Sequence, residues 1–204
     1  MENVTYRMAT KEASRIVVKD ARFAYVHLLE PRAAAEGAEA KYSVTLIIPK
    51  TDEAGIAAIK AAMKAAVSKK FGDKPPKGLR NPLRDGDEKD GESGEYMKGD
   101  EFRGNWYLSA SSKKPVRALA GKARMPATDE HLQSGNYGAA ELNFYGYDAA
   151  GNRGVAAGLN GVWITRKGEP LGSGATDWGV IEAEDFGSPA ASAATASMSA
   201  DDVF

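Results

Sequence analysis

Acidic side chains occur at spacings that suggest a metal ion, first in the segment DGDEKDG at residues 85–91. Asp85 and Asp87 match the first two ligands of a calcium-binding EF-hand loop. The third ligand position, however, is Lys89, and the twelfth residue of the loop, where a bidentate Glu is needed, is Tyr96. We therefore interpret this segment as a solvated acidic loop and expect no calcium there.

A second group, Asp129, Glu130 and His131, has side chains that hold magnesium in nucleases. No other acidic cluster on a recognisable scaffold lies near it in the sequence. Cysteine is absent, and His27 and His131 are the only histidines, which excludes disulfides, zinc-thiolate sites and imidazole-rich metal sites. We expect no metal and no cofactor, and we keep a metal-dependent nuclease or nucleotide-processing enzyme as an alternative function.

The last four residues combine two carboxylates with an aromatic ring. They follow residues 187–200, which are almost entirely Ala, Ser and Thr with one Pro. Such a segment has too little apolar bulk to offset the entropy of ordering. We expect a flexible linker that ends in an acidic, hydrophobic tip and binds a partner protein through Asp201, Asp202, Val203 and Phe204.

Charge is distributed unevenly along the 204 residues. Residues 177–204 hold six of the 28 acidic side chains and none of the 27 Lys and Arg, so the body keeps 27 basic against 22 acidic side chains. A basic body with an acidic tail is typical of a polyanion-binding protein that screens its own site. The length predicts one domain, residues 1–176, followed by a tail, residues 177–204. No leader pattern or long apolar run is present, so we expect an intracellular protein without a membrane span.

The elements that must position these groups are mainly strands. Runs of β-branched and aromatic residues predict strands at residues 15–29, 41–48, 105–111 and 115–120. One helix is predicted over residues 51–71, because apolar side chains recur at helical spacing, Asp52 and Glu53 lie in the first turn and Gly72 follows the end. About residues 73–104, dense in Gly, Pro and charge, we expect a long exposed loop.

The strongest β signal is a predicted hairpin of residues 137–147 and 154–165, joined by a turn at residues 148–152. Alternation places Leu142 and Phe144 on the core face, and Tyr145 and Tyr147 on the opposite face. Two tyrosines on the outer face of a strand are a candidate platform for base stacking, although ordinary packing under a loop is the simpler explanation for each alone.

Four motifs carry a family resemblance: KYSVTLIIPK at residues 41–50, NPLRDGD at 81–87, SGNYGAAELNFYGYDAAGNRGVAAGLN at 134–160 and GEPLGSG at 168–174. They span roughly residues 16–174 in the same order as in the phage-encoded single-stranded-DNA-binding proteins long catalogued as a domain of unknown function, which this chain resembles. The resemblance implies an OB-fold, a small Greek-key barrel, with no enzymatic activity. It also implies a protein that coats single-stranded DNA during phage replication, recombination or repair, in the cytoplasm of the infected bacterium. The tip at residues 201–204 is similar to the tips with which bacterial and phage single-stranded-DNA-binding proteins recruit enzymes.

Sequence-independent capture of a single strand needs cations for phosphates and flat aromatic faces for bases. The cations that we expect to contact phosphate lie at strand ends or in loops beside the barrel segments: Arg80, Arg84, Lys113, Lys114, Arg117 and Arg153. The rings that we expect to stack are Tyr107, Tyr145 and Tyr147, with Phe23 and Trp106 as weaker candidates. A virion structural protein is a further alternative, although it has no use for a Phe-tipped acidic tail. The sequence leaves homo-oligomer formation open.

Overall fold

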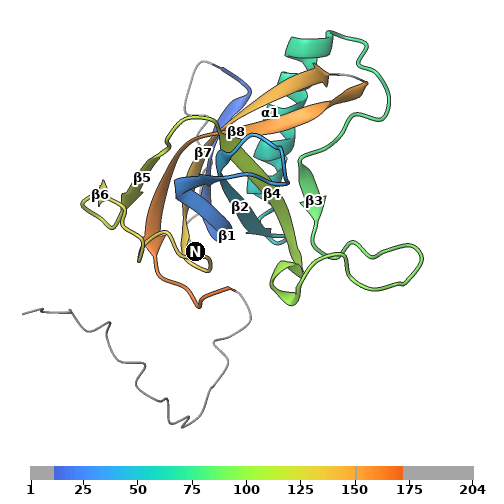
Figure 1. Ribbon diagram of the computed structural model, residues 1–204. Coiled ribbons are helices and arrows are strands. Elements are labelled where there is room, and N and C mark those ends of the chain that lie inside the picture. The colour runs from blue at the N-terminus through green and yellow to red at the C-terminus, as the bar shows by residue number, and fades with distance from the viewer. Residues whose placement is uncertain (1–11, 150, 172–204) are drawn as a thin grey trace, which may run out of the picture. The chain divides into compact units, whose positions relative to one another are not determined.

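The computed structural model describes residues 12–149 and 151–171, and most of its elements are strands (Figure 1). The strands are β1 Arg15–Arg32, β2 Lys41–Pro49, β3 Leu83–Asp85, β4 Asn105–Ser112, β5 Arg117–Ala120, β6 Met125–Pro126, β7 Tyr137–Ala149 and β8 Asn152–Arg166. The helix α1 spans Glu53–Phe71, and the short 3₁₀ helix η1 spans Asp100–Phe102. The predicted linker, the tip and the domain boundary at residue 176 lie outside the described residues.

Five strands close a barrel in the order β4, β2, β1, β7 and β8. Neighbours in this series pair antiparallel, and β8 returns to β4 through a short parallel pairing, Ala110 with Ala157 and Ser111 with Gly158. A closed five-stranded barrel of this kind is the OB-fold that the resemblance implied. The mainly β fold class with one α-helix is confirmed.

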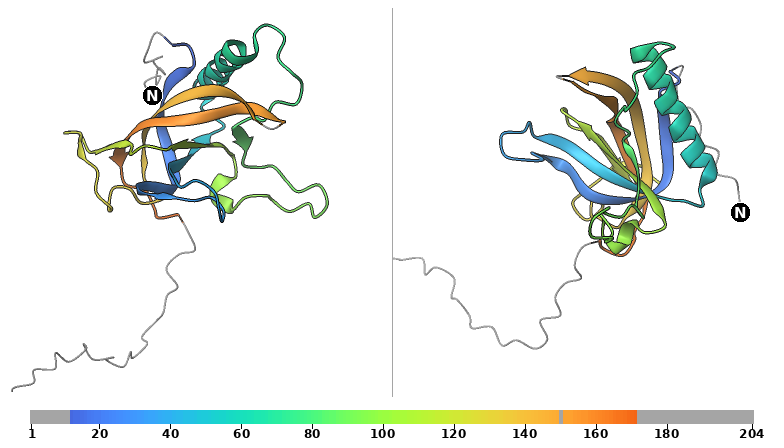
Figure 2. Two further views of the ribbon diagram at one scale, coloured as in Figure 1. Left: turned by 45° about the horizontal axis from the view of Figure 1, so that its top comes forward. Right: turned by 90° about the vertical axis from the view of Figure 1, so that its right-hand side faces the viewer.

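The barrel is filled by side chains that alternate along its strands. Leu46, Leu108 and Leu142 are fully buried there, together with the rings of Phe23 and Phe144. The helix α1 lies against β7 and β1 (Figure 2) and adds one apolar face to the same core. Burial of this contiguous apolar surface is what holds helix and barrel together.

The helix begins and ends where local signals predict. The Asp52 carboxylate accepts a hydrogen bond from the Gly55 backbone N–H at 3.0 Å, which caps the first turn. Gly72 ends the helix with a φ of 69°, a left-handed conformation that glycine adopts without strain. None of the helices in residues 12–149 and 151–171 is long and apolar enough to cross a bilayer.

The hairpin prediction is confirmed, with β7 and β8 longer than expected and the turn correspondingly shorter. The segment at about residues 73–104 differs from a plain exposed loop, because it contains β3 and η1. Phe102 of η1 is fully buried against Ala24 and Ile47 on the outside of the barrel. Because Phe102 covers it, Ile47 on the outer side of β2 is buried as well.

Candidate nucleic-acid interface

The outer face of β2 and β4 carries a strip of small hydroxyl side chains. Thr45 and Ser109 are opposite each other and share a hydrogen bond of 2.8 Å, and Ser43 faces Ser111 two residues further along. We call these four residues the hydroxyl strip. Small polar side chains let another backbone approach closely, and in OB-folds this face, made by the second and third barrel strands, binds oligonucleotides.

A row of three aromatic rings borders one end of the strip. The ring of Tyr25 stacks on Phe102, with centroids 6.1 Å apart and planes inclined by 16°. Phe102 in turn meets the ring of Tyr107 edge to face at 5.0 Å. We call Tyr25, Phe102 and Tyr107 the aromatic row. Phe102 is fully buried, whereas Tyr25 is 54% exposed, so the row ends in a ring that is open to a ligand.

An irregularity in β1 turns Tyr25 outward. The pairing of β1 with β2 shifts register between Ala24 and His27, and Tyr25 has a φ of 48°. A left-handed conformation of this kind costs a non-glycine residue about 1–3 kcal/mol, and strained residues cluster at binding sites. The cost is offset by the stacking on Phe102 and by the pairing of the strand on both sides.

Lys50 holds the loop that carries Phe102. Its Nζ lies 2.6 Å from Asp85 Oδ1 and 2.7 Å from Asp87 Oδ2. Asp87 Oδ1 also accepts a hydrogen bond from the Gly104 backbone N–H at 2.9 Å, which ties the start of the loop to its end. The two carboxylates that resembled metal ligands therefore bind a lysine. The ammonium of Lys50 lowers the pKa of both carboxyls, and they raise the pKa of Lys50.

Lys50, Asp85 and Asp87 form a charged triad, and the stability that Lys50 contributes through it should depend on pH. Lowered carboxyl pKa values mean that the stabilisation is present at neutral pH and is lost as pH falls through those pKa values, below about pH 4. The raised pKa of Lys50 means that the stabilisation is also lost as pH rises through that pKa, above about pH 10.4.

We expect Lys50→Met to lower the melting temperature at pH 7, and the difference from the unaltered protein to shrink at both extremes. Melting curves monitored by circular dichroism between pH 3 and 11 measure this difference. Lys122→Met, which removes an exposed lysine far from the triad in sequence, is the control. A difference that does not change with pH contradicts the assignment.

Tyr145 borders the other side of the hydroxyl strip. Its side chain is 47% exposed, and a Cβ at position 158 would lie 3.6 Å from its ring, so the ring rests over Gly158. Gly158 pairs with Ser111 of the strip. Tyr145 also lines a cavity of about 270 Å³ with Lys69 and Lys70 of α1. The stacking position predicted for Tyr145 thus lies next to the strip, and two lysines line the same cavity.

Cations lie at both ends of the strip. At the aromatic end, the exposed Arg84 faces Tyr107 across β3 and β4, and Lys98 Nζ lies 5.7 Å from the Tyr107 ring centroid. At the other end, Lys113 and Lys114 follow β4 directly and are exposed, and Lys113 forms an ion pair of 2.7 Å with Glu39. The structure therefore brings three of the predicted phosphate contacts, Arg84, Lys113 and Lys114, to the strip.

Two more of the predicted cations, Arg80 and Arg153, lie together near the β7–β8 hairpin. The Arg80 backbone N–H donates to the Arg153 carbonyl at 2.9 Å, and Arg153 Nε lies 3.0 Å from Asp148 Oδ2. Tyr147 is half-buried in the same hairpin, opposite Gly154. These residues are placed at the turn of the hairpin, beyond Tyr145.

Two predicted stacking residues face the core. Phe23 is fully buried, which leaves no ring face for a base, and we withdraw it as a stacking residue. Trp106 is half-buried and packs against the core, with Lys50 and Lys60 ammonium groups 5.6 and 5.2 Å from its ring centroid. In contrast, Tyr25, Phe102 and Lys98 were not predicted and lie at the candidate interface.

The alternative magnesium site is not assembled. His131 Nδ1 lies 2.8 Å from the hydroxyl of Thr128 and accepts the backbone N–H of the same residue at 3.2 Å. Across residues 12–149 and 151–171, no three side chains of His, Asp or Glu are grouped so that they could hold a metal ion. Asp129 lies instead beside β1, in a shallow cavity lined by Val26 and Leu29.

Comparisons with known proteins identify the family of this chain. The family model described as Enterobacter phage Enc34, ssDNA-binding protein, matches residues 14–195. The putative protein p50 of Acyrthosiphon pisum secondary endosymbiont phage 1 is 34% identical over 177 residues, which cover 84% of this chain and 92% of that protein.

Solved structures share the fold. The single-stranded DNA-binding protein from bacteriophage Enc34, in complex with ssDNA, has a TM-score of 0.67 at 22% identity, and the match covers 84% of this chain and 100% of that one. A further structure of the Enc34 protein has a TM-score of 0.63 at 22% identity, covering 86% and 97%. From the match to the family model and the identity to p50, the chain belongs to the Enc34 single-stranded-DNA-binding protein family.

Proposed function

We propose that this protein binds single-stranded DNA without sequence preference across the outer face of β1, β2 and β4. The observation that carries the proposal is the aromatic row, which ends in the exposed ring of Tyr25 beside the hydroxyl strip. An open ring stacks on any base, and the cations at both ends of the strip contact phosphate, which carries no base information. Membership in a family of DNA-binding proteins, which are not enzymes, supports this role over a nuclease or a virion structural protein.

The proposed path of the strand follows the order of these groups. Bases stack on Tyr25 at one end of the hydroxyl strip and on Tyr145 at its side, next to Ser111, while Arg84, Lys98, Lys113 and Lys114 contact phosphates. Burial raises the pKa of the Tyr107 hydroxyl, so this side chain stays neutral and does not repel phosphate. We propose that Tyr107 and Phe102 support the Tyr25 ring from below.

Removing either exposed ring tests this path. Tyr25→Ala and Tyr145→Ala should each weaken binding of oligo-dT by about 5- to 150-fold, which corresponds to the roughly 1–3 kcal/mol that a stacked base contributes. Replacement of either residue by Phe should change affinity little, because the ring face remains. Fluorescence anisotropy with labelled oligonucleotides measures both effects.

The melting temperature separates stacking from packing in these variants. Tyr25 and Tyr145 are about half exposed, so their Ala variants should melt close to the unaltered protein. Phe102→Ala is the contrasting variant, because loss of a fully buried phenyl ring costs about 3–5 kcal/mol of stability. Tyr25→Ala and Tyr145→Ala variants that melt early in the same way would show that these rings are structural.

We further propose that two parts of the chain have different roles. Residues 1–176 form the DNA-binding domain, and residues 177–204, with six acidic and no basic side chains, recruit a replication or recombination enzyme in the infected bacterial cell. Within that segment Asp201, Asp202, Val203 and Phe204 supply charge and an aromatic ring for a basic, apolar pocket on the partner. The composition of these residues supports this role.

A further inference from the structure

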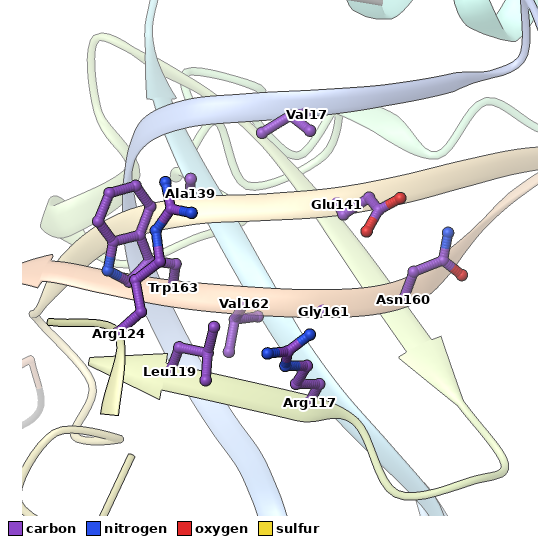
Figure 3. A pocket seen from close by; sticks show the side chains of 10 residues that line it. All are labelled: Val17, Arg117, Leu119, Arg124, Ala139, Glu141, Asn160, Gly161, Val162 and Trp163. Carbon is purple, nitrogen blue, oxygen red and sulfur yellow. The ribbon is translucent and has the colours of Figure 1, made fainter. Parts of the chain in front are cut away.

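A pocket outside the proposed interface lies on the outer face of β7, β8 and β5 (Figure 3). Its volume is about 330 Å³. The strand pairing fixes its layout: Gly161 of β8 lies between Arg117 of β5 and Glu141 of β7, and Trp163 lies between Leu119 and Ala139. Because residue 161 is a glycine, the floor at the centre of the pocket is bare backbone.

One end of the pocket is a flat, charged wall. The indole Nε1–H of Trp163 donates to the Gly121 carbonyl at 2.8 Å, which fixes the orientation of the ring. The guanidinium of Arg124 lies 4.5 Å from the centroid of this ring. Arg124 has a φ of 53°, and this left-handed backbone ends the tight turn that follows β5. Trp163 and Arg124 together offer a surface on which a planar ligand stacks.

The other end of the pocket is polar. Figure 3 shows Arg117, Glu141 and Asn160 at this end, away from Trp163. Arg117 is exposed, and its guanidinium forms no hydrogen bond or ion pair within the described part of the chain. The Glu141 carboxylate accepts a hydrogen bond of 2.7 Å from Arg15 Nε, so its charge is compensated and does not repel an anion. A guanidinium is therefore free for a phosphate.

We propose that this pocket holds a nucleotide of the same DNA strand, beyond those on the hydroxyl strip. The inference rests on the proposed function. Gly158, over which Tyr145 lies, precedes Gly161 by three residues and Trp163 by five, about 10 and 16 Å along β8. A strand that leaves Tyr145 thus reaches the pocket along one continuous β-strand. The base stacks against Trp163 and Arg124, and Arg117 binds its phosphate.

A variant that fills the pocket tests this inference without changing the charge of the protein. Gly161 has no left-handed φ, and a Cβ there would meet only the Arg117 carbonyl oxygen, at 3.4 Å, so Gly161→Val fits the strand. Its side chain fills the floor. We expect affinity for an oligo-dT of about 16 nucleotides to fall about fivefold or more, and affinity for one of about 5 nucleotides to stay unchanged, since single OB-folds occupy roughly 4–16 nucleotides.

A matched pair of charge variants gives an independent readout. Arg124→Ala should weaken binding of the long oligonucleotide about fivefold or more, because it removes half of the stacking wall. Lys122→Ala removes one exposed charge from the same turn but does not line the pocket, and it should have a smaller effect. In a Trp106→Phe, Trp178→Phe protein, where Trp163 is the remaining tryptophan, the long oligonucleotide should quench emission and the short one should not.

The outcomes separate this inference from the proposed function. If the unaltered protein binds neither oligonucleotide, the proposed function fails. If it binds both, and Gly161→Val and Arg124→Ala match it on both lengths with Trp163 emission unchanged, the pocket is not a nucleotide site and the proposed function stands. Melting curves show whether Gly161→Val is folded, and if it is not, Arg124→Ala and Trp163 emission decide.

Discussion

Raising the salt concentration from about 50 to about 200 mM should weaken binding of oligo-dT by roughly 50-fold. The proposed interface offers about four phosphate contacts, and each lowers the slope of log affinity against log salt by about 0.7 for single strands, which gives a total slope of about −2.8. The expected loss is large because cations lie at both ends of the hydroxyl strip. Anisotropy titrations at four or five salt concentrations measure the slope.

Single substitutions show how much each residue contributes to the salt dependence of binding. Lys114 is exposed and follows β4 directly, so Lys114→Ala should make the slope less steep by about 0.7, equally for oligo-dT and for mixed sequence. Arg166→Ala is the control, because Arg166 lies at the end of β8 with an ion pair of 3.2 Å to Asp20. A slope near zero removes the electrostatic part of the proposal. Unequal losses between the two sequences show base readout in place of phosphate contact.

Local signals in the sequence were sufficient for the helix and the hairpin. Asp52 and Gly72 mark the ends of α1, and the alternation around Leu142 identifies the core face of β7. The closure of the barrel had no such signal. It depends on the parallel pairing of Ala110 with Ala157, two small residues far apart in sequence, and only the family resemblance predicted it. Pairing between distant strands is set by the packing of the whole core.

The sequence predicted only some of the residues of the proposed interface. Tyr145 was predicted because alternation holds through β7, so its outward position follows from Phe144 being buried. Tyr25 was missed because it is in phase with Phe23, and only the register shift and the left-handed backbone send the two rings to opposite sides. Phe102 was missed because it lies in a charged loop, where one apolar residue gives no periodic signal.

The carboxylates of the same loop show that spacing in the sequence does not identify the group that a side chain binds. Asp85 and Asp87 have the spacing of metal ligands, and the sequence argued against calcium only through Lys89 and Tyr96. Their actual partner, Lys50, lies before α1 and is brought to them by the pairing of β2 with β4 and of β4 with β3. A cation that arrives from a distant strand cannot be read from local spacing.

Phe204→Ala should abolish capture of the partner enzyme and leave affinity for single-stranded DNA unchanged. An aromatic anchor in a pocket contributes a large share of the binding energy of such a contact, whereas the charges that act on DNA are kept in this variant. Pull-down from extracts of infected cells, with the unaltered protein and Phe204→Leu beside it, measures capture of the partner. A Phe204→Ala protein that still recruits the same enzyme shows that the tip is not the recruiting element.

Deleting residues 177–204 should instead tighten DNA binding. Six acidic side chains on the same chain as a basic interface compete with phosphate at a high effective concentration. The gain should be largest at low salt, where charges are screened least, and should shrink as the Debye length falls from about 30 Å at 0.01 M to about 10 Å at 0.1 M. Changing the six acids to Asn and Gln should reproduce the gain of the deletion. If only the deletion tightens binding, the competition does not come from charge, and the acidic residues serve the partner alone.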